Sequence, residues 1–173
     1  MKDKIVIIVN GQGGSGKDTL CRYFCDYYDG EITSAITPFI PIAEAAGYTG
    51  GKSDHDRKFL SDLQDVVDDY IALSIDWIDD ELDRFSKNDK SVLFFVIRKP
   101  EHITYARKTA RSFGLRATTL VIRRKAIERD FGNNADDRVL EYPYEYAFDN
   151  DTPIEISHPD FVTFIKIITD EVA

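Results

Sequence analysis

Residues 5–19 read Ile-Val-Ile-Ile-Val-Asn-Gly-Gln-Gly-Gly-Ser-Gly-Lys-Asp-Thr, and this stretch decides the fold. An apolar run, a glycine-rich turn and the start of an amphipathic segment predict a buried strand, a turn and a helix. The spacing from Gly11 to Gly16-Lys17 fits G-x-x-x-x-G-K, which in that context is a phosphate-binding loop (P-loop). Glycines let the backbone approach a phosphate, and the helix N-terminus adds a partial positive charge. The sequence therefore predicts a loop that binds nucleotide phosphates, with Lys17 reaching the β- and γ-phosphates.

The residue after Lys17 departs from the usual motif. Asp18 stands where a serine or threonine usually binds Mg²⁺, and Thr19 follows one position later. Asp18 either accepts a hydrogen bond from a metal-bound water or is an acidic residue favoured by the helix dipole. Whether Ser15 or Thr19 lies nearer the metal stays open. The candidate nucleotide-binding residues are Gly11, Gly13, Gly14, Ser15, Gly16, Lys17, Asp18 and Thr19, of which Thr19 and Asp18 are the candidate magnesium ligands.

The composition is that of a single globular domain. The chain has 173 residues, of which 43% are hydrophobic and 12% aromatic, and this excludes a disordered chain. No apolar run reaches the length of a membrane span, and the first residues lead into a strand rather than a signal peptide. Cys21 and Cys25 lie four positions apart, which fits neither a zinc site nor a redox motif, so we expect two buried thiols. We expect one cytoplasmic domain over residues 1–173 with no membrane partner.

The net charge of −9 is unevenly distributed along the chain. Residues 98–129 hold ten lysines and arginines against two glutamates, a net charge of +8, so the remaining residues carry −17. An acidic body disfavours non-specific binding of nucleic acid. A local basic segment suits a small polyphosphate, so we expect a small-molecule partner rather than a nucleic acid.

Strand and helix patterns alternate along the chain, which predicts an α/β fold with a mostly parallel sheet and helices on both faces. Five strands are expected near residues 4–9, 31–36, 91–97, 117–122 and 146–149. The run 91–97 is the most apolar and is expected at the centre of the sheet. Helices are expected near residues 16–28, 42–46, 54–87, 101–113 and 159–172, with 54–87 as two helices or one continuous helix.

Arg98 and Lys99 follow the strand expected at 91–97, where many P-loop proteins place an acidic residue. Strand ends face the ligand crevice in an open parallel sheet, so Arg98 either faces a negative group or is a surface arginine on a loop. Phosphorylation of an alcohol needs a general base, and the ends of the second and third strands offer no carboxylate nearby. A phosphate acceptor needs cations instead, which favours a phosphorylated acceptor. Asp18 as a base keeps an alcohol acceptor open.

Three segments together resemble a known family. Gly16-Lys17-Asp18-Thr19 is similar to the Gly-Lys-Asp-Thr of phage-type deoxynucleoside monophosphate kinases, a branch of the adenylate kinase superfamily. The run Thr118–Arg124 and the run Tyr146–Asp151 match the order of elements seen in the same branch. The resemblance covers residues 4–172 loosely and is most specific at the P-loop. It implies a three-layer P-loop NTPase fold, with ATP and Mg²⁺ as cofactors and Thr19 in contact with phosphate.

The resemblance also implies roles for residues outside the loop. Arg98 and Arg57 would hold the acceptor phosphate, although Arg57 could instead pair with Asp54 or Asp62. Asn150 lies where the loop around the donor base passes. The polar segment 123–140 would form a short lid, and residues 37–87 a helical region that binds the acceptor. The arginines that would clamp the transferred group are Arg123, Arg124 and Arg129.

Three functions follow from these observations. The first is ATP-dependent phosphoryl transfer to a small phosphorylated acceptor, a nucleoside or deoxynucleoside monophosphate. The second is a P-loop kinase of a small-molecule alcohol, such as a coenzyme precursor or a sugar acid. The third is a nucleotide-binding protein without catalysis. The sequence does not determine the base of the acceptor, the choice between ATP and GTP, or the oligomeric state.

Overall fold

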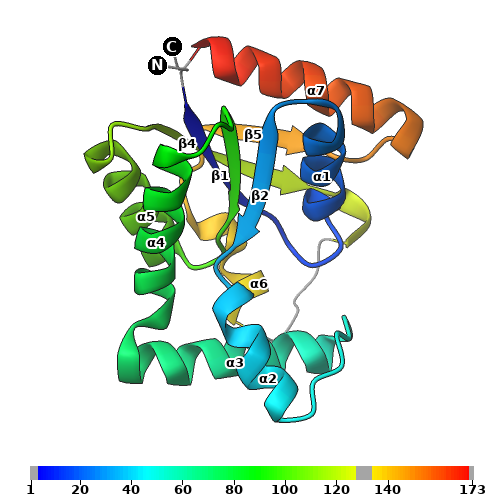
Figure 1. Cartoon of the computed structure of the whole chain (residues 1–173). Coiled ribbons are helices and arrows are strands. Elements are labelled where there is room, and N and C mark those ends of the chain that lie inside the picture. The colour runs from blue at the N-terminus through cyan, green and yellow to red at the C-terminus, as the bar shows by residue number, and fades with distance from the viewer. Residues whose placement is uncertain (1–3, 128–133, 172–173) are drawn as a thin grey trace.

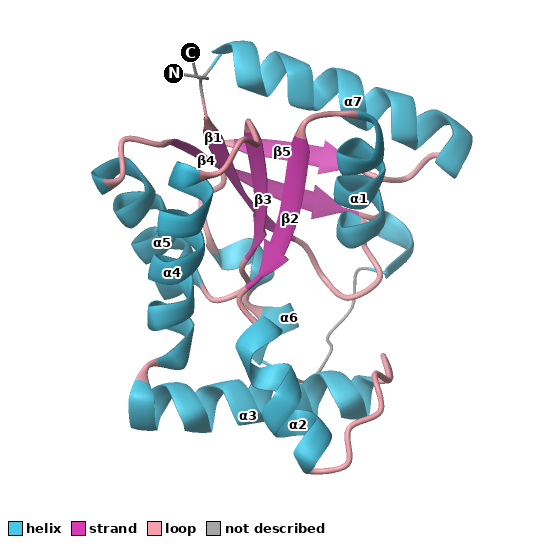
Figure 2. Ribbon diagram, viewed as in Figure 1, coloured by secondary structure: helices cyan, strands magenta, loops and turns pink. Residues whose placement is uncertain are grey.

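The computed structural model describes residues 4–127 and 134–171. Within these residues, five strands form one parallel sheet in the order β2-β3-β1-β4-β5, with helices on both faces (Figures 1 and 2). This arrangement confirms the predicted three-layer α/β fold, and every strand pair is parallel. The strands are β1 (Ile5–Asn10), β2 (Gly30–Ser34), β3 (Val92–Val96), β4 (Arg116–Arg123) and β5 (Tyr146–Asp149).

β1, and not β3, is the middle strand of the sheet, so the expectation for residues 91–97 was wrong in this detail. β3 lies between β2 and β1, and both β1 and β3 are buried along their whole length. A continuous apolar run indicates that both faces of a strand are buried. Every interior strand of a parallel sheet is buried in this way, so the run does not identify the middle strand. The register aligns Val9 with Val96 and with Leu120, so the carboxyl ends of the three interior strands meet at one edge.

The helices divide between the two faces of the sheet. α1 and α7 pack on one face, against Ile5, Ile7 and Val9 of β1. α4 and α5 pack on the other face, against Val6 and Ile8. α2 and α3 lie beyond the carboxyl end of β2 (Figure 1). The helices are α1 (Lys17–Tyr27), α2 (Ile40–Ala45), α3 (Asp54–Ile71), α4 (Leu73–Lys87), α5 (Pro100–Ser112), α6 (Asn134–Asp137) and α7 (Ile154–Glu171), with short 3₁₀ turns at Thr37–Phe39, Lys125–Ile127 and Val139–Glu141.

For the helical segments expected at 54–87 and 159–172, the structure decides between two alternatives in the first and corrects the starting residue of the second. The segment 54–87 is two helices, because Ala72 between them takes a left-handed conformation with φ of 53°. α7 begins at Ile154, five residues before Pro159, where the helix was expected to start. Pro159 lies in the second turn of the helix, where its missing N–H costs one helical hydrogen bond but does not end the helix. At the start of α7, the Pro153 carbonyl accepts from the amides of Ile156 and Ser157 at 3.0 and 2.9 Å.

The structure also bears on the two cysteines, on possible membrane helices and on the segment expected as a lid. Cys21 is buried, whereas Cys25 is half-buried, and burial raises the pKa of both thiols, that of Cys25 to about 11. None of the described helices has the length and apolar character needed to cross a membrane. Of the segment 123–140, residues 128–133 lie outside the described residues, and with them Arg129 and Gly132.

Candidate functional site

The P-loop joins β1 to α1, as predicted. Gly14 and Gly16 have φ values of 89° and 86°, in the left-handed region that favours glycine, and Gly16 forms the N-cap of α1. A side chain at Gly16 would collide with Asn150, whose Nδ2 donates to the Ser15 carbonyl at 2.8 Å. The carboxyl end of β5 therefore lies against the P-loop, and the glycine is required both for backbone conformation and for this close approach.

Asn10, the last residue of β1, organises the start of the loop. Its side chain is fully buried, and its Oδ1 accepts from the Gly11 amide at 2.8 Å. Its Nδ2 donates to the Arg98 carbonyl at 2.9 Å and to the Tyr144 hydroxyl at 2.7 Å. The Tyr144 hydroxyl in turn donates to the Val139 carbonyl at 2.7 Å. One asparagine thus ties the P-loop to the end of β3 and to the segment that follows α6.

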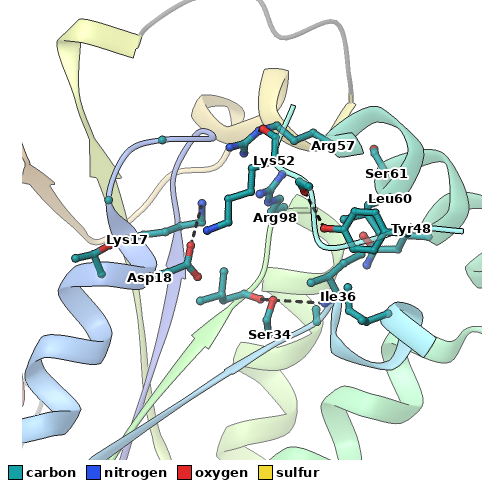
Figure 3. A pocket seen from close by; sticks show the side chains of 18 of the residues that line it. Lys17, Asp18, Ser34, Ile36, Tyr48, Lys52, Arg57, Leu60, Ser61 and Arg98 are labelled. Atoms are coloured by element: carbon teal, nitrogen blue, oxygen red, sulfur yellow. Dashed lines mark hydrogen bonds and ion pairs between the residues drawn. The ribbon is translucent and has the colours of Figure 1, made fainter. Parts of the chain in front are cut away.

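Lys17 is the buried cation of the loop, with 4% of its surface exposed. Burial and the nearby Arg98 guanidinium lower the pKa of Lys17 to about 8, while Asp18 and Asp136 oppose this change. Its Nζ lies 4.0 Å from Asp18 Oδ2 (Figure 3). A buried lysine with a lowered pKa marks a place where an added anion is strongly favoured.

Arg98 pairs with a carboxylate that the sequence analysis did not expect. Its Nη1 donates to Asp136 Oδ2 at 3.1 Å, and Asp136 Oδ1 accepts from the Gly13 amide of the P-loop at 2.7 Å. Asp136 is fully buried. The expectation that no carboxylate lies near the end of β3 was therefore wrong. It considered residues next to the strand ends in sequence, whereas α6 brings Asp136 there from 38 residues farther along the chain.

A cavity of about 470 Å³ extends from the P-loop to α3, between the ends of β2 and β3 (Figure 3). One part of its lining is cationic, and the other is mostly apolar. Arg57 donates through Nε to the Lys52 carbonyl at 3.0 Å, and a side chain at Gly13 would collide with the Arg57 guanidinium. The cations of the lining are Lys17, Lys52, Arg57, Arg98 and Arg124, and the apolar residues include Ile36, Ile40, Tyr48 and Leu60.

Two polar side chains of α3 also line the cavity. Ser61 is 4% exposed, and its buried hydroxyl has no hydrogen-bond partner within residues 4–127 and 134–171. Gln64 is 6% exposed and donates through Nε2 to the Ser74 hydroxyl at 2.8 Å. A buried polar atom without a partner is costly and marks a position where a ligand can supply the missing hydrogen bond.

No protein-family model matches the chain, and no curated protein resembles it in sequence. Solved structures do resemble it along nearly its whole length. The tunicamycin resistance protein of Deinococcus radiodurans has a TM-score of 0.60 at 10% identity and covers 95% of each chain. A sugar kinase of Janibacter has a TM-score of 0.52 at 18% identity, with 99% and 98% covered. A gluconokinase of Sinorhizobium meliloti has a TM-score of 0.52 at 12% identity, with 98% and 95% covered.

The chain has the fold of the P-loop kinases. At these identities the likeness concerns the fold alone, and the choice of acceptor rests on the cavity.

The P-loop kinase fold brings most of the predicted site residues together. Lys17, Asp18 and Thr19 line the cavity with Arg57 and Arg98, and Arg124 joins them from the end of β4. Arg123 does not line it, because its Nε donates to Asp149 Oδ1 at 2.8 Å on the neighbouring strand. Asn150 contacts the backbone of the P-loop.

Sequence reasoning missed several residues of the site, among them Asn10, Lys52, Ser61 and Asp136. Asn10 directly precedes the first P-loop glycine and ends an otherwise apolar strand, which could have marked it. Ser61 and Lys52 carry no motif and reach the cavity through the position of α3. Asp136 sits in a polar stretch whose sequence resembles a solvent-exposed loop.

Proposed function

We propose that the protein transfers the γ-phosphoryl group of ATP to a small phosphorylated acceptor, and that this acceptor is a nucleoside or deoxynucleoside monophosphate. The observation that carries the proposal is the convergence of Lys17, Arg57 and Arg98 on one cavity. Two phosphates that must approach each other repel, and fixed cations offset this repulsion. A single bound phosphate group would not need all three of these cations.

The donor phosphates would lie on the P-loop. Gly14, Gly16 and Lys17 line the cavity where α1 begins, and a helix N-terminus favours a bound phosphate. Arg124 would neutralise charge that shifts during transfer. Arg98 and Arg57 would hold the acceptor phosphate, because both guanidinium groups line the cavity and can fork onto phosphate oxygens.

The remainder of the acceptor would occupy the part of the cavity near α3. Ile36, Leu60 and the ring of Tyr48 offer apolar surface for a planar group. The Tyr48 hydroxyl donates to the Gly51 carbonyl at 2.9 Å, which holds the ring in place. Ser61 adds a hydroxyl that can bind an edge of that group. A mixed wall of this kind suits a nucleobase better than a polyol, which needs more polar partners.

Mg²⁺ fits this site as an ion carried by the nucleotide. Asp18 and Thr19 expose oxygen atoms in the first turn of α1, and Mg²⁺ prefers such ligands together with phosphate oxygens and water. Within the described parts of the chain, no three His, Cys, Asp or Glu side chains gather as a metal cage. When bound there, Mg²⁺ would neutralise charge on the phosphates.

A coupled assay of ADP production over a panel of nucleoside monophosphates and small alcohols tests the proposal. We expect turnover with at least one monophosphate. Lys17→Ala should abolish turnover, whereas Lys58→Ala, which removes an exposed lysine of α3 paired with Asp62, should keep it. Tight ATP binding without turnover of any acceptor would contradict the proposal and support a non-catalytic nucleotide-binding protein.

One observation favours a second function, the phosphorylation of an alcohol. Asp136 places a carboxylate at the end of β3, next to the P-loop, and a carboxylate can act as the general base that a hydroxyl acceptor needs. The Gly13 amide and Arg98 already engage this carboxylate, so we rank this function second. Turnover of alcohols and of no monophosphate in the same assay would reverse the order.

A further inference from the structure

The Asp136 carboxylate accepts hydrogen bonds from two groups that a phosphate would also bind. Its Oδ1 accepts from the Gly13 amide at 2.7 Å, and its Oδ2 accepts from Arg98 Nη1 at 3.1 Å. The first group belongs to the P-loop, and the second is the cation proposed to hold the acceptor. Transfer to a phosphate acceptor needs no general base, so this fully buried carboxylate has no role in the transfer as described above.

The position of Asp136 is anchored by the residues that follow it in the chain. Three residues later, Val139 is 1% exposed and its carbonyl accepts from the Tyr144 hydroxyl at 2.7 Å. That hydroxyl accepts from Asn10, which also donates to the Arg98 carbonyl. The segment that carries Asp136 and the backbone of Arg98 are therefore anchored to the same asparagine, directly in front of the P-loop.

A phosphate bound at the Gly13 amide and the Asp136 carboxylate exclude each other. The amide has one hydrogen to donate, and two anions at hydrogen-bond distance in a buried site repel strongly. The donor phosphate therefore has to replace the carboxylate at the amide. Once the carboxylate leaves, Arg98 loses this ion pair and gains the freedom to bind another anion.

We propose that Asp136 is a positioning residue that holds Arg98 against the P-loop until the donor phosphate replaces its carboxylate at the Gly13 amide, which releases Arg98 to the acceptor. The proposal rests on the proposed function, because it assigns Arg98 to the acceptor phosphate. It makes donor and acceptor binding cooperative, since each removes an obstacle to the other.

Binding of the non-hydrolysable ATP analogue AMP-PNP with Mg²⁺, measured by calorimetry without acceptor, tests this exchange. Asp136→Asn keeps the shape of the side chain but removes its charge, so we expect AMP-PNP to bind at least fivefold more tightly. Asp137→Asn removes the same charge from the neighbouring exposed position of α6 and should stay within twofold of wild type. Equal affinities of the two variants would overturn the proposal.

The ¹H–¹⁵N resonance of the Gly13 amide gives a second readout, which a merely structural role of Asp136 would not move. Without ligand, this resonance should differ between wild type and Asp136→Asn, because the amide has different partners. At saturation with AMP-PNP the two resonances should converge, since a phosphate oxygen is then the partner in both. If the difference persists unchanged at saturation, the carboxylate has not left and the proposal is wrong.

The wild-type chain provides a test that does not depend on folding of the variant. Its Gly13 amide resonance should move as AMP-PNP is titrated, and an unmoved resonance at saturation would overturn the exchange. All these measurements omit the acceptor, so they separate this inference from the proposed function. A chain that phosphorylates no monophosphate but shows the tighter binding of Asp136→Asn refutes the proposed function alone.

Discussion

Asn10 donates through Nδ2 to the Tyr144 hydroxyl at 2.7 Å, across 134 positions of the chain. The contact joins the last residue of β1 to the residue two positions before β5, and the same hydroxyl donates to the Val139 carbonyl. Burial raises the pKa of Tyr144 well above its ordinary value, so the phenol stays protonated and keeps its donor. The start of the P-loop and the segment after α6 therefore share one buried hydrogen-bond network.

Tyr144→Phe should destabilise the protein by about 1–3 kcal/mol, because it leaves Asn10 Nδ2 and the Val139 carbonyl each without one partner. Urea unfolding followed by circular dichroism measures the loss. Tyr70→Phe removes a hydroxyl from a side chain that is 88% exposed and should change stability by less than about 0.5 kcal/mol. Equal losses in the two variants would show that the network contributes nothing to stability.

Nucleotide binding should weaken as the pH rises above about 8. Lys17 has a pKa of about 8 in the free protein, and bound phosphates would keep it protonated, so binding takes up a proton above that pH. Calorimetry with AMP-PNP at pH 7–10 measures the change. Lys17→Arg keeps a charge at every pH in this range and should lose this part of the pH dependence. Identical pH profiles of the two proteins would contradict the assignment.

The same pKa determines how Lys17 affects folding. The unfolded chain keeps Lys17 near its ordinary value of 10.5, so between about pH 8 and 10.5 the unfolded state binds more protons than the folded state. The contribution of Lys17 to the free energy of unfolding therefore rises with pH across this window. Urea unfolding of wild type and Lys17→Met at pH 7 and pH 9.5 should show a stability difference that narrows at the higher pH.

Ser61→Ala should weaken acceptor binding without lowering the stability of the free protein. The Ser61 hydroxyl is buried without a partner among the described residues, which costs about 1–3 kcal/mol of desolvation. Its removal should therefore leave the stability of the free protein unchanged or raise it. Loss of its hydrogen bond to the acceptor should raise the acceptor KM several-fold and leave the KM for ATP unchanged. Ser112→Ala, in the exposed last turn of α5, serves as the control. An unchanged acceptor KM would exclude Ser61 from recognition.

Ala72→Gly should stabilise the protein by about 0.5–1 kcal/mol. The left-handed conformation of Ala72 costs about 1–2 kcal/mol, and glycine removes this cost. Part of the resulting gain in stability is lost because glycine has more conformational freedom in the unfolded chain. Ala72→Val should be destabilising, since a β-branched side chain tolerates this conformation least. Thermal unfolding measures both variants. The same sign of effect in both would show that backbone conformation at the junction of α3 and α4 does not limit stability.

Much of the fold followed from local patterns. The alternating strand and helix periods predicted the five strands, and β5 was expected at its observed bounds of Tyr146–Asp149. The two errors of position, the middle strand and the start of α7, have a common cause. Local composition cannot separate one buried strand from another, nor a proline at the start of a helix from one in its second turn.

The sequence by itself determined the P-loop between β1 and α1, because glycine spacing and two flanking apolar periods act over a few adjacent residues. It also placed Arg98 at a strand end that faces the site. Only the tertiary structure decided that Asp136 binds both Arg98 and the Gly13 amide, the latter from 123 positions away, and that Ser61 lines the cavity. Such contacts depend on how α3 and α6 pack against the sheet edge. No short-range period in the chain encodes that packing.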